Sequence, residues 1–116
     1  MKNLLLIIVA LFLLTACESE KAEGTVLIFK YKDSVQCNFD SGVPLETMAA
    51  ELSEANVDVL CSTEAHDGNA VITVCGAETG VINVFKIPSP SLIAAENLGF
   101  NDIQILESAN VVLECE

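Results

Sequence analysis

An unbroken run of eleven apolar residues, 4–14, lies close to the start of this chain, with Lys2 just before it. A helix that crosses a bilayer needs about 20 apolar residues, so the run is too short to span a membrane. A short apolar run behind a positive charge is typical of a signal peptide. The folded part of the protein is therefore expected to lie entirely after this segment.

The run ends in Leu14, Thr15, Ala16 and Cys17. An aliphatic residue and two small residues before a cysteine resemble the lipobox of bacterial lipoproteins. The resemblance implies that residues 1–16 are removed as a signal peptide, that the Cys17 sulfur carries a diacylglycerol and that its amine is acylated. Two or more acyl chains give lasting membrane attachment where one does not. The alternative is an ordinary secretory signal, with Cys17 in a disulfide.

The rest of the 116-residue chain has room for one domain, since a domain usually needs about 100 residues. We expect residues 17–24 to be the lipidated cysteine and a flexible tether, and residues 25–116 to be a single globular domain. The polar tether is predicted to be disordered and to reach only about 15 Å. In proteobacterial lipoproteins an Asp after the cysteine favours retention in the inner membrane. Glu18 stands there instead, which favours the outer membrane.

The predicted mature chain is strongly acidic. Removal of residues 1–16 leaves four lysines and no arginine against seventeen acidic residues, a formal net charge of −13. A nucleic-acid binder needs clustered Lys and Arg to neutralise phosphates, so nucleic-acid binding is excluded as a function. The same charge should repel anionic lipid headgroups and hold the domain off the membrane surface.

Four cysteines remain after Cys17, and they are Cys37, Cys61, Cys75 and Cys115. An even number of cysteines in an exported domain predicts two structural disulfides, because the bacterial periplasm is oxidising. Three pairings are open, and the sequence does not choose among them. A zinc site or a redox-active dithiol would need a Cys-x-x-Cys pair, which is not present.

The first half of the domain predicts a strand, a loop and a helix. Residues 25–31 are β-branched and aromatic, which favours a central strand, and a polar loop over 33–43 holds Cys37. Pro44 suits the first position of a helix. The apolar residues that follow recur at helical spacing and predict one buried face: Leu45, Met48, Ala49 and Leu52. Asn56 is suited to the left-handed position after the helix, with Val57 as the hydrophobic residue beyond it.

The second half predicts short strands and a second helix. Asp67 and Gly68 favour a tight turn over 65–69. Ser89 is a predicted cap and Pro90 a first helical position, and Gly99 followed by an aromatic residue predicts the end of that helix. The expected strands cover residues 57–62, 70–75 and 81–87, with a turn over 76–80, and two short strand candidates follow at 103–106 and 111–113.

These elements predict an α+β domain with the order β-α-β-β-β-α-β, because strands and helices do not alternate strictly. The first and second strands should be parallel, and the central strands antiparallel with short turns. Two helices on one face of a small sheet are the economical packing. A ferredoxin-like, split β-α-β arrangement is the preferred fold. A thioredoxin-like core without the redox motif is the alternative.

Few residues suggest chemistry. His66 is the only histidine, and Glu64, His66 and Asp67 are weak candidates for a metal or acid–base site. A histidine in an Asp-Gly turn is more often a solvated turn residue. A nucleophilic pair of Cys61 and His66 would require a free thiol, which an oxidising compartment disfavours. No phosphate-binding loop or nucleophile-elbow motif is present, and no cofactor is implied.

Two functions remain open. The preferred one is a non-enzymatic interaction or ligand-binding module of the bacterial envelope, anchored in the outer membrane through the lipid on Cys17 and facing the periplasm. Its partner would be another envelope protein or a ligand. The alternative is a periplasmic thiol-dependent enzyme or redox protein that uses Cys37, Cys61 or His66.

Overall fold

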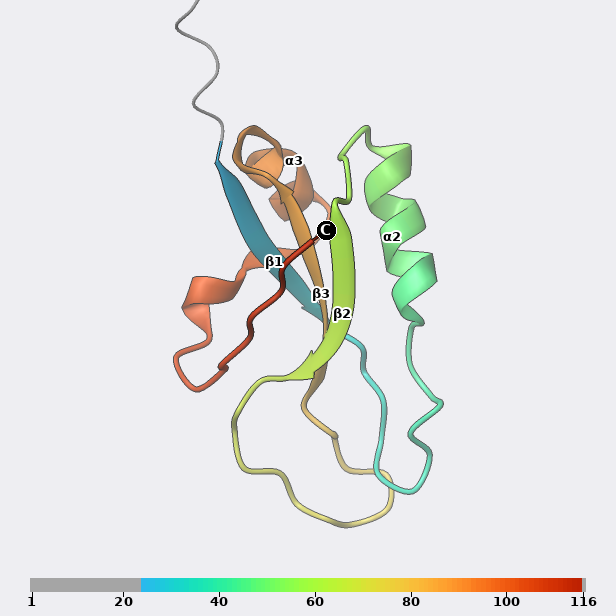
Figure 1. The fold of residues 1–116 in the computed structure, drawn as a ribbon. Coiled ribbons are helices and arrows are strands. Elements are labelled where there is room, and N and C mark those ends of the chain that lie inside the picture. Colours follow the sequence, from blue (N-terminus) through green and yellow to red (C-terminus); the bar gives the residue numbers. More distant parts are fainter. Residues whose placement is uncertain (1–23, 116) are drawn as a thin grey trace, which may run out of the picture.

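A four-stranded antiparallel sheet with two helices on one face forms the centre of the molecule (Figure 1). The computed structural model describes residues 24–115; the predicted signal peptide and nearly all of the tether lie outside this range. Short 3-10 helices cover Ser89–Ser91 and Ile103–Ile105. In chain order, the main elements are β1 (Thr25–Tyr31), α2 (Leu45–Glu54), β2 (Cys61–His66), β3 (Val81–Pro88), α3 (Leu92–Asn97) and β4 (Asn101–Asp102).

The strands lie in the order β2-β3-β1-β4. Both β1 and β2 pair with β3 in the antiparallel sense, so β1 and β2 are parallel to each other with β3 between them. The α+β class is confirmed, and this strand order is consistent with the preferred split β-α-β, ferredoxin-like arrangement. The predicted element order had one strand too many, since the observed order is β-α-β-β-α-β.

Strand β3 is the middle of the core. Alternate residues of a strand point to opposite faces, and both faces of β3 are covered. Phe85 and Ile87 pack toward the helices, and Ile82 and Val84 pack on the other side of the sheet. All four side chains are buried. The prediction that this strand is covered on both faces is confirmed.

Helix α2 buries the predicted apolar face against the sheet. Met48 and Leu52 are fully buried. The helix ends as predicted, in a left-handed residue followed by a hydrophobic one. Asn56 has a positive φ of 62°, and the Val57 N–H donates to the Leu52 carbonyl at 2.9 Å. Pro44 is the N-cap rather than the first helical residue, because its ψ of 152° is extended.

Helix α3 is short and leads into the same core. Gly99 has a φ of 95° and the Phe100 N–H donates to the Ala95 carbonyl, which confirms the predicted stop. The buried Phe100 ring meets Phe85 edge to face, with centroids 5.7 Å apart. Ser89 does not cap this helix through its side chain; it begins the 3-10 turn that leads into α3.

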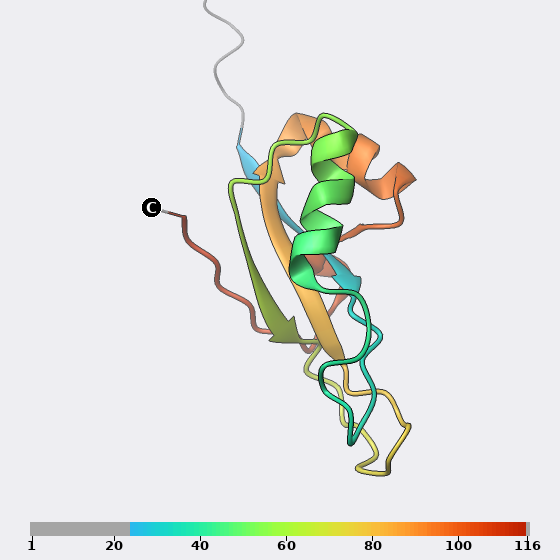
Figure 2. The same ribbon diagram turned by 90° about the vertical axis from the view of Figure 1, so that its right-hand side faces the viewer.

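The other face of the sheet is covered by residues 103–115, which we call the C-terminal strap (Figure 2). Four apolar residues of the strap pack on the sheet: Ile103, Leu106, Val111 and Leu113. The strands predicted at 103–106 and 111–113 are wrong, because the strap contains only a 3-10 turn. The Asp102 carboxylate accepts the Gln104 N–H at 2.9 Å, which turns the chain away from the sheet after β4.

The strands predicted in the middle of the chain are partly wrong. β2 begins at Cys61 rather than at residue 57, because the Val57 N–H closes helix α2 and is not available to a sheet. Residues 70–75 form no strand, and the tight turn at 65–69 is absent. Instead, β2 and β3 pair directly and residues 67–80 form one long connection.

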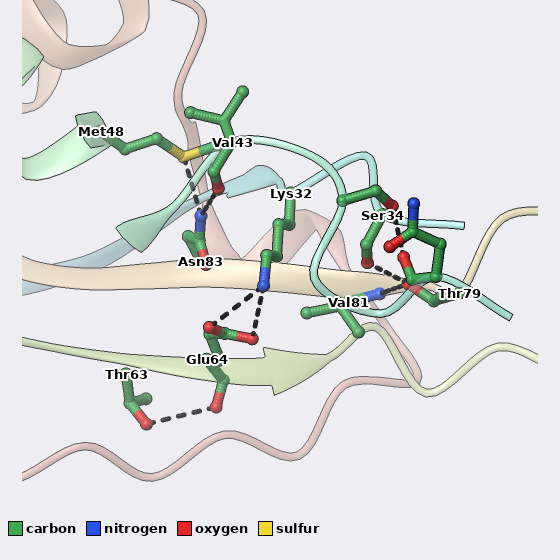
Figure 3. A network of polar contacts seen from close by, with 11 residues as sticks. Lys32, Ser34, Val43, Met48, Thr63, Glu64, Thr79, Val81 and Asn83 are labelled. Carbon is green, nitrogen blue, oxygen red and sulfur yellow. Dashed lines mark hydrogen bonds and ion pairs between the residues drawn. The ribbon is translucent and has the colours of Figure 1, made fainter. Parts of the chain in front are cut away.

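Asn83 connects the loop before helix α2, residues 32–44, and helix α2 itself to the sheet (Figure 3). Its side chain is fully buried, and its amide group donates to the Val43 carbonyl at 3.0 Å. The same nitrogen lies 3.2 Å from the Met48 sulfur. The Asn83 Oδ1 has no hydrogen-bond partner within residues 24–115. This amide therefore fixes the chain just before α2, on the side of the sheet that the helices cover.

Candidate functional site

Two long loops, 32–44 and 67–80, lie side by side at the end of the sheet opposite Gly24 (Figures 1 and 2). We call these two loops the loop end. Backbone hydrogen bonds continue the pairing of β1 and β3 into them. The Lys32 N–H donates to the Val81 carbonyl at 3.1 Å, and the Gln36 N–H donates to the Ala77 carbonyl at 2.8 Å. The base of the loop end is therefore a twisted ribbon that extends the sheet.

A disulfide locks this ribbon near its tip. Cys37 and Cys75 are bonded, with their Cα atoms 5.1 Å apart. Cys37 has a positive φ of 70°, a conformation that non-glycine residues rarely adopt. The next residue after Cys75 is Gly76, whose φ of 89° suits a glycine. The disulfide thus holds a turn in each loop against the other.

Several large apolar side chains within four residues of this disulfide in the sequence are exposed to solvent. We call Phe39, Val71, Ile72 and Val74 the apolar tip. Phe39, in the first loop, is 61% exposed. Ile72 and Val74, in the second loop, are 71% and 60% exposed. Val71, Ile72 and Val74 follow one another closely in the second loop, and neighbouring exposed apolar residues, unlike scattered single ones, mark interaction sites. A hollow of about 320 Å³ opens at this tip and is lined by Ala70, Val71, Ile72, Ala77 and Glu78.

Apart from Lys32 at its base, which pairs with Glu64, the charged side chains of the loop end are all acidic. Asp33, Asp40 and Glu78 are exposed, and no lysine occurs in residues 33–44 or 67–80. Glu78 lines the hollow at the apolar tip, and Asp40 follows Phe39 directly in the chain. The loop end is therefore an apolar surface with an acidic rim.

Beneath the tip, buried hydroxyl groups join the two loops (Figure 3). The Ser34 and Thr79 hydroxyl oxygens lie 2.7 Å apart, and both residues are almost fully buried. The Thr79 hydroxyl also accepts the Val81 N–H at 3.2 Å. Polar groups at such depth cost stability unless they are hydrogen-bonded, and these are satisfied by one another. They fix the loop end from within.

Asp67 is the one buried acid of the loop end, with 6% of its surface exposed. Its carboxylate accepts the Tyr31 hydroxyl and the Asn69 N–H, each at 2.9 Å. Burial alone raises the pKa of Asp67. The hydrogen bonds from Asn69 and Tyr31 and the nearby His66 outweigh burial and lower its pKa below the usual range. Burial, followed by the contact with Asp67, raises the pKa of Tyr31.

The His66 ring is exposed to solvent, as expected, but it stands at the end of strand β2 and is also held by hydrogen bonds to the backbone. Its Nδ1 accepts the Gly68 N–H at 2.9 Å, and its Nε2 lies 2.9 Å from the Thr79 carbonyl oxygen. An Nδ1 that accepts a hydrogen bond leaves the proton on Nε2, which then donates to Thr79. A Cβ added at Gly80 would lie only 2.7 Å from Nε2, so this packing requires a glycine. The ring thus braces the second loop.

The residues suggested as a metal site have other partners. Glu64 pairs with Lys32, with Nζ and Oε2 3.4 Å apart (Figure 3). Asp67 is held by Tyr31 and Asn69, and His66 by its backbone contacts. Within residues 24–115, no three His, Cys, Asp or Glu side chains are grouped so that they could hold a metal ion.

No free thiol is available between residues 24 and 115 for the suggested thiol chemistry. Cys37 is bonded to Cys75, and Cys61 is bonded to Cys115. Cys61 and His66 stand at opposite ends of strand β2, about 16 Å apart at 3.3 Å per residue. They therefore do not form a nucleophile–base pair.

Two findings bear on the membrane. Cys17, the predicted lipidation site, lies outside the described residues. No helix within residues 24–115 is long and apolar enough to cross a membrane.

The sequence does not predict the apolar tip, because residues 70–75 have the composition of a buried strand. The contact between Tyr31 and Asp67 is also not predicted, because the sequence carries no local signal for it. No family model, curated protein or solved structure matches this chain. Any functional assignment therefore depends on the chain's own geometry, and the loop end is its most distinctive surface.

Proposed function

We propose that this protein is a lipid-anchored module of the bacterial envelope that acts by non-enzymatic contact through its loop end. The observation that carries the proposal is the position of the apolar tip. Solvent-exposed Phe39, Ile72 and Val74 are held by the Cys37–Cys75 disulfide at the end of the sheet opposite Gly24. A covalent brace on an exposed apolar surface presents that surface in one shape, which favours binding.

The direction of strand β1 supports this arrangement. β1 connects the predicted tether to the loop end, and its seven residues span about 23 Å at 3.3 Å per residue. A lipid on Cys17 would therefore hold the Gly24 side of the domain toward the membrane. The loop end would then face the periplasm, where another envelope protein can meet it. The expected location is the outer membrane, on its periplasmic side.

The disulfides also support a binding module over a thiol enzyme or redox protein. Both cysteines that such an enzyme would use, Cys37 and Cys61, are bonded. A free-thiol count on the oxidised protein under native and denaturing conditions tests this point. We expect no reactive thiol among residues 24–115. One or two reactive thiols would instead favour the thiol-dependent alternative.

Two measurements test the proposal. First, Cys17→Ser should move the protein from the membrane fraction to the soluble fraction, and sedimentation of this variant with membranes in high salt would contradict lipid anchoring. Second, a photoreactive amino acid at position 72 should cross-link to another envelope protein in living cells. Position 93 is the control, because Ile93 is 72% exposed and Ile72 71%. Equal cross-linking from both positions would contradict the loop end as the contact surface.

A further inference from the structure

We infer that the loop end binds a protein surface that is apolar at its centre and basic at its rim. This inference deepens the proposed function and rests on it, since it names the chemistry of the partner. It combines the composition of the apolar tip with the charge of the residues around it.

The centre of the contact follows from the apolar tip. Phe39 from the first loop and Ile72 and Val74 from the second are each more than half exposed. The Cys37–Cys75 bond and the ribbon of backbone hydrogen bonds hold the two loops together. The tip therefore loses little conformational freedom on binding, and a partner with apolar side chains gains contacts with all of it.

The rim of the contact follows from the charges. Asp33, Asp40 and Glu78 are exposed and no lysine lies in residues 33–44 or 67–80. The two lysines nearest in sequence are engaged elsewhere: Lys30 contacts Glu51 at 3.4 Å and Lys32 contacts Glu64 at 3.4 Å. An acidic rim favours a partner with Lys or Arg around its apolar centre, since complementary charges steer association and select partners.

The same charges disfavour two other occupants. A second copy of this chain would bring an acidic rim against an acidic rim, and like charges across an interface are costly. An anionic lipid surface would be repelled in the same way. A basic-rimmed protein is the occupant that both the apolar and the charged parts of the loop end favour.

A peptide library tests the chemistry of the partner while the partner itself is unidentified. The probe is a displayed library of random peptides, selected against the oxidised protein in lipid nanodiscs. We expect enriched peptides that combine aromatic or aliphatic residues with Lys or Arg. Their affinity should fall about thirtyfold or more in Ile72→Ser, the loss that defines a binding hot spot. It should stay unchanged in Ile93→Ser, which alters an equally exposed isoleucine on α3.

The charge is tested with a second pair of variants. Asp40→Asn with Glu78→Gln should weaken the enriched peptides severalfold, mainly through the association rate. Asp58→Asn with Glu96→Gln is the matched control, because these acids lie outside the loop end. Replacing the basic residues of a selected peptide with Glu should abolish its binding. Thermal melting of each variant checks that the fold is retained.

The outcomes separate the inference from the proposed function. Peptides that depend on Ile72 but carry no basic residues would overturn the basic rim and leave the loop end as a contact surface. Peptides that ignore both Ile72 and the acids, or no enrichment at all, would count against the inference and the surface alike. Binding to vesicles of phosphatidylglycerol and phosphatidylethanolamine that is lost in Phe39→Ser and Ile72→Ser would overturn the inference in favour of a lipid surface.

Discussion

The two faces of the sheet are built in different ways. The helix-covered face packs α2 and α3 onto Ile28, Phe85 and Ile87, all fully buried. The opposite face buries Phe29, Ile82 and Val84 under a strap with almost no regular structure. The first face is held by helices that satisfy their own backbone hydrogen bonds. The second depends on a segment that is tied at its far end by the Cys61–Cys115 disulfide.

A small sheet can thus be covered on both sides without a second helical layer. An irregular segment has few backbone hydrogen bonds of its own, so its order must come from side-chain packing and from covalent restraint. We therefore expect the helix-covered face to be indifferent to redox conditions, and the strap-covered face to depend on them.

A matched pair of core substitutions measures the comparison directly. Ile82 and Ile87 both lie on β3 and are both fully buried, but on opposite faces. Ile87→Ala should cost about 3–5 kcal/mol of unfolding free energy and Ile82→Ala about 2–3 kcal/mol, because the strap can settle into the cavity more readily than the helices. Urea unfolding of both variants gives the values. Equal costs would show that the strap packs as rigidly as the helices.

Removal of the Cys61–Cys115 disulfide should loosen the strap but no other segment. Cys61→Ser with Cys115→Ser should cost about 2–4 kcal/mol and raise hydrogen exchange in residues 103–115. The control is Cys37→Ser with Cys75→Ser, which opens a loop with a separation of 38 residues rather than 54 and should cost nearly as much. That control should leave exchange in the strap unchanged. Equal strap exchange in the two variants would contradict the separate role of the Cys61–Cys115 bond.

One contact joins the strap to the loop end, and a glycine permits it. Gly68 has a φ of 83°, and a Cβ added there would clash with the Ser108 carbonyl oxygen. Gly68→Ala should cost about 2 kcal/mol, from the strained backbone and the clash together. Gly76→Ala is the control, because Gly76 has a φ of 89° but no heavy atom within 4 Å of an added Cβ. Thermal unfolding of the two variants separates the clash from the backbone strain, and equal losses would argue against the contact.

The smallest effect concerns pH and the base of the loop end. The pKa of Asp67 is lowered in the folded protein, so its contribution to stability is present above its unfolded pKa of about 4 and is lost as pH falls through the folded value. The pKa of Tyr31 is raised, so its contribution is present below about pH 10 and is lost as pH rises further.

The variant Tyr31→Phe removes the hydrogen bond that both shifts share. It should cost about 1 kcal/mol at pH 7, the usual net value of one hydrogen bond. It should also make stability less dependent on pH at both the acid and the alkaline end. Urea unfolding between pH 3 and pH 11, compared with the unchanged protein, tests this. Parallel pH profiles for the two proteins would show that the contact does not set the shifts.

The sequence predicts the helix-covered face well, because its signals are local. The spacing of Met48 and Leu52 indicates the buried side of α2, and Asn56 and Gly99 mark the residues after each helix. Strand β3 is equally clear from its continuous apolar run. These features depend on neighbours in the chain, so a single sequence is enough to predict them.

The loop end and the strap could not be predicted, because their structure depends on distant partners. Residues 70–75 have strand-forming side chains, but their position is set by the bond of Cys75 to Cys37. Val111 and Leu113 also resemble a strand, yet they pack across the sheet without joining it. The sequence does not determine how the four cysteines pair. The arrangement of the loop end and of the strap depends on that pairing, so it is not determined either.

The two disulfides interleave along the chain, since Cys61 lies between Cys37 and Cys75, while its own partner is Cys115. If the cysteines were oxidised in the order of their synthesis, Cys37 would form a non-native bond with Cys61, the next cysteine in the chain. The native pair of Cys61 can form only after Cys115, 54 residues further along the chain, has been delivered. Maturation is then expected to require rearrangement of an early bond, and a disulfide isomerase should speed the refolding of the reduced chain. Refolding at the same rate without the isomerase would show that the sheet forms first and brings the correct cysteines together.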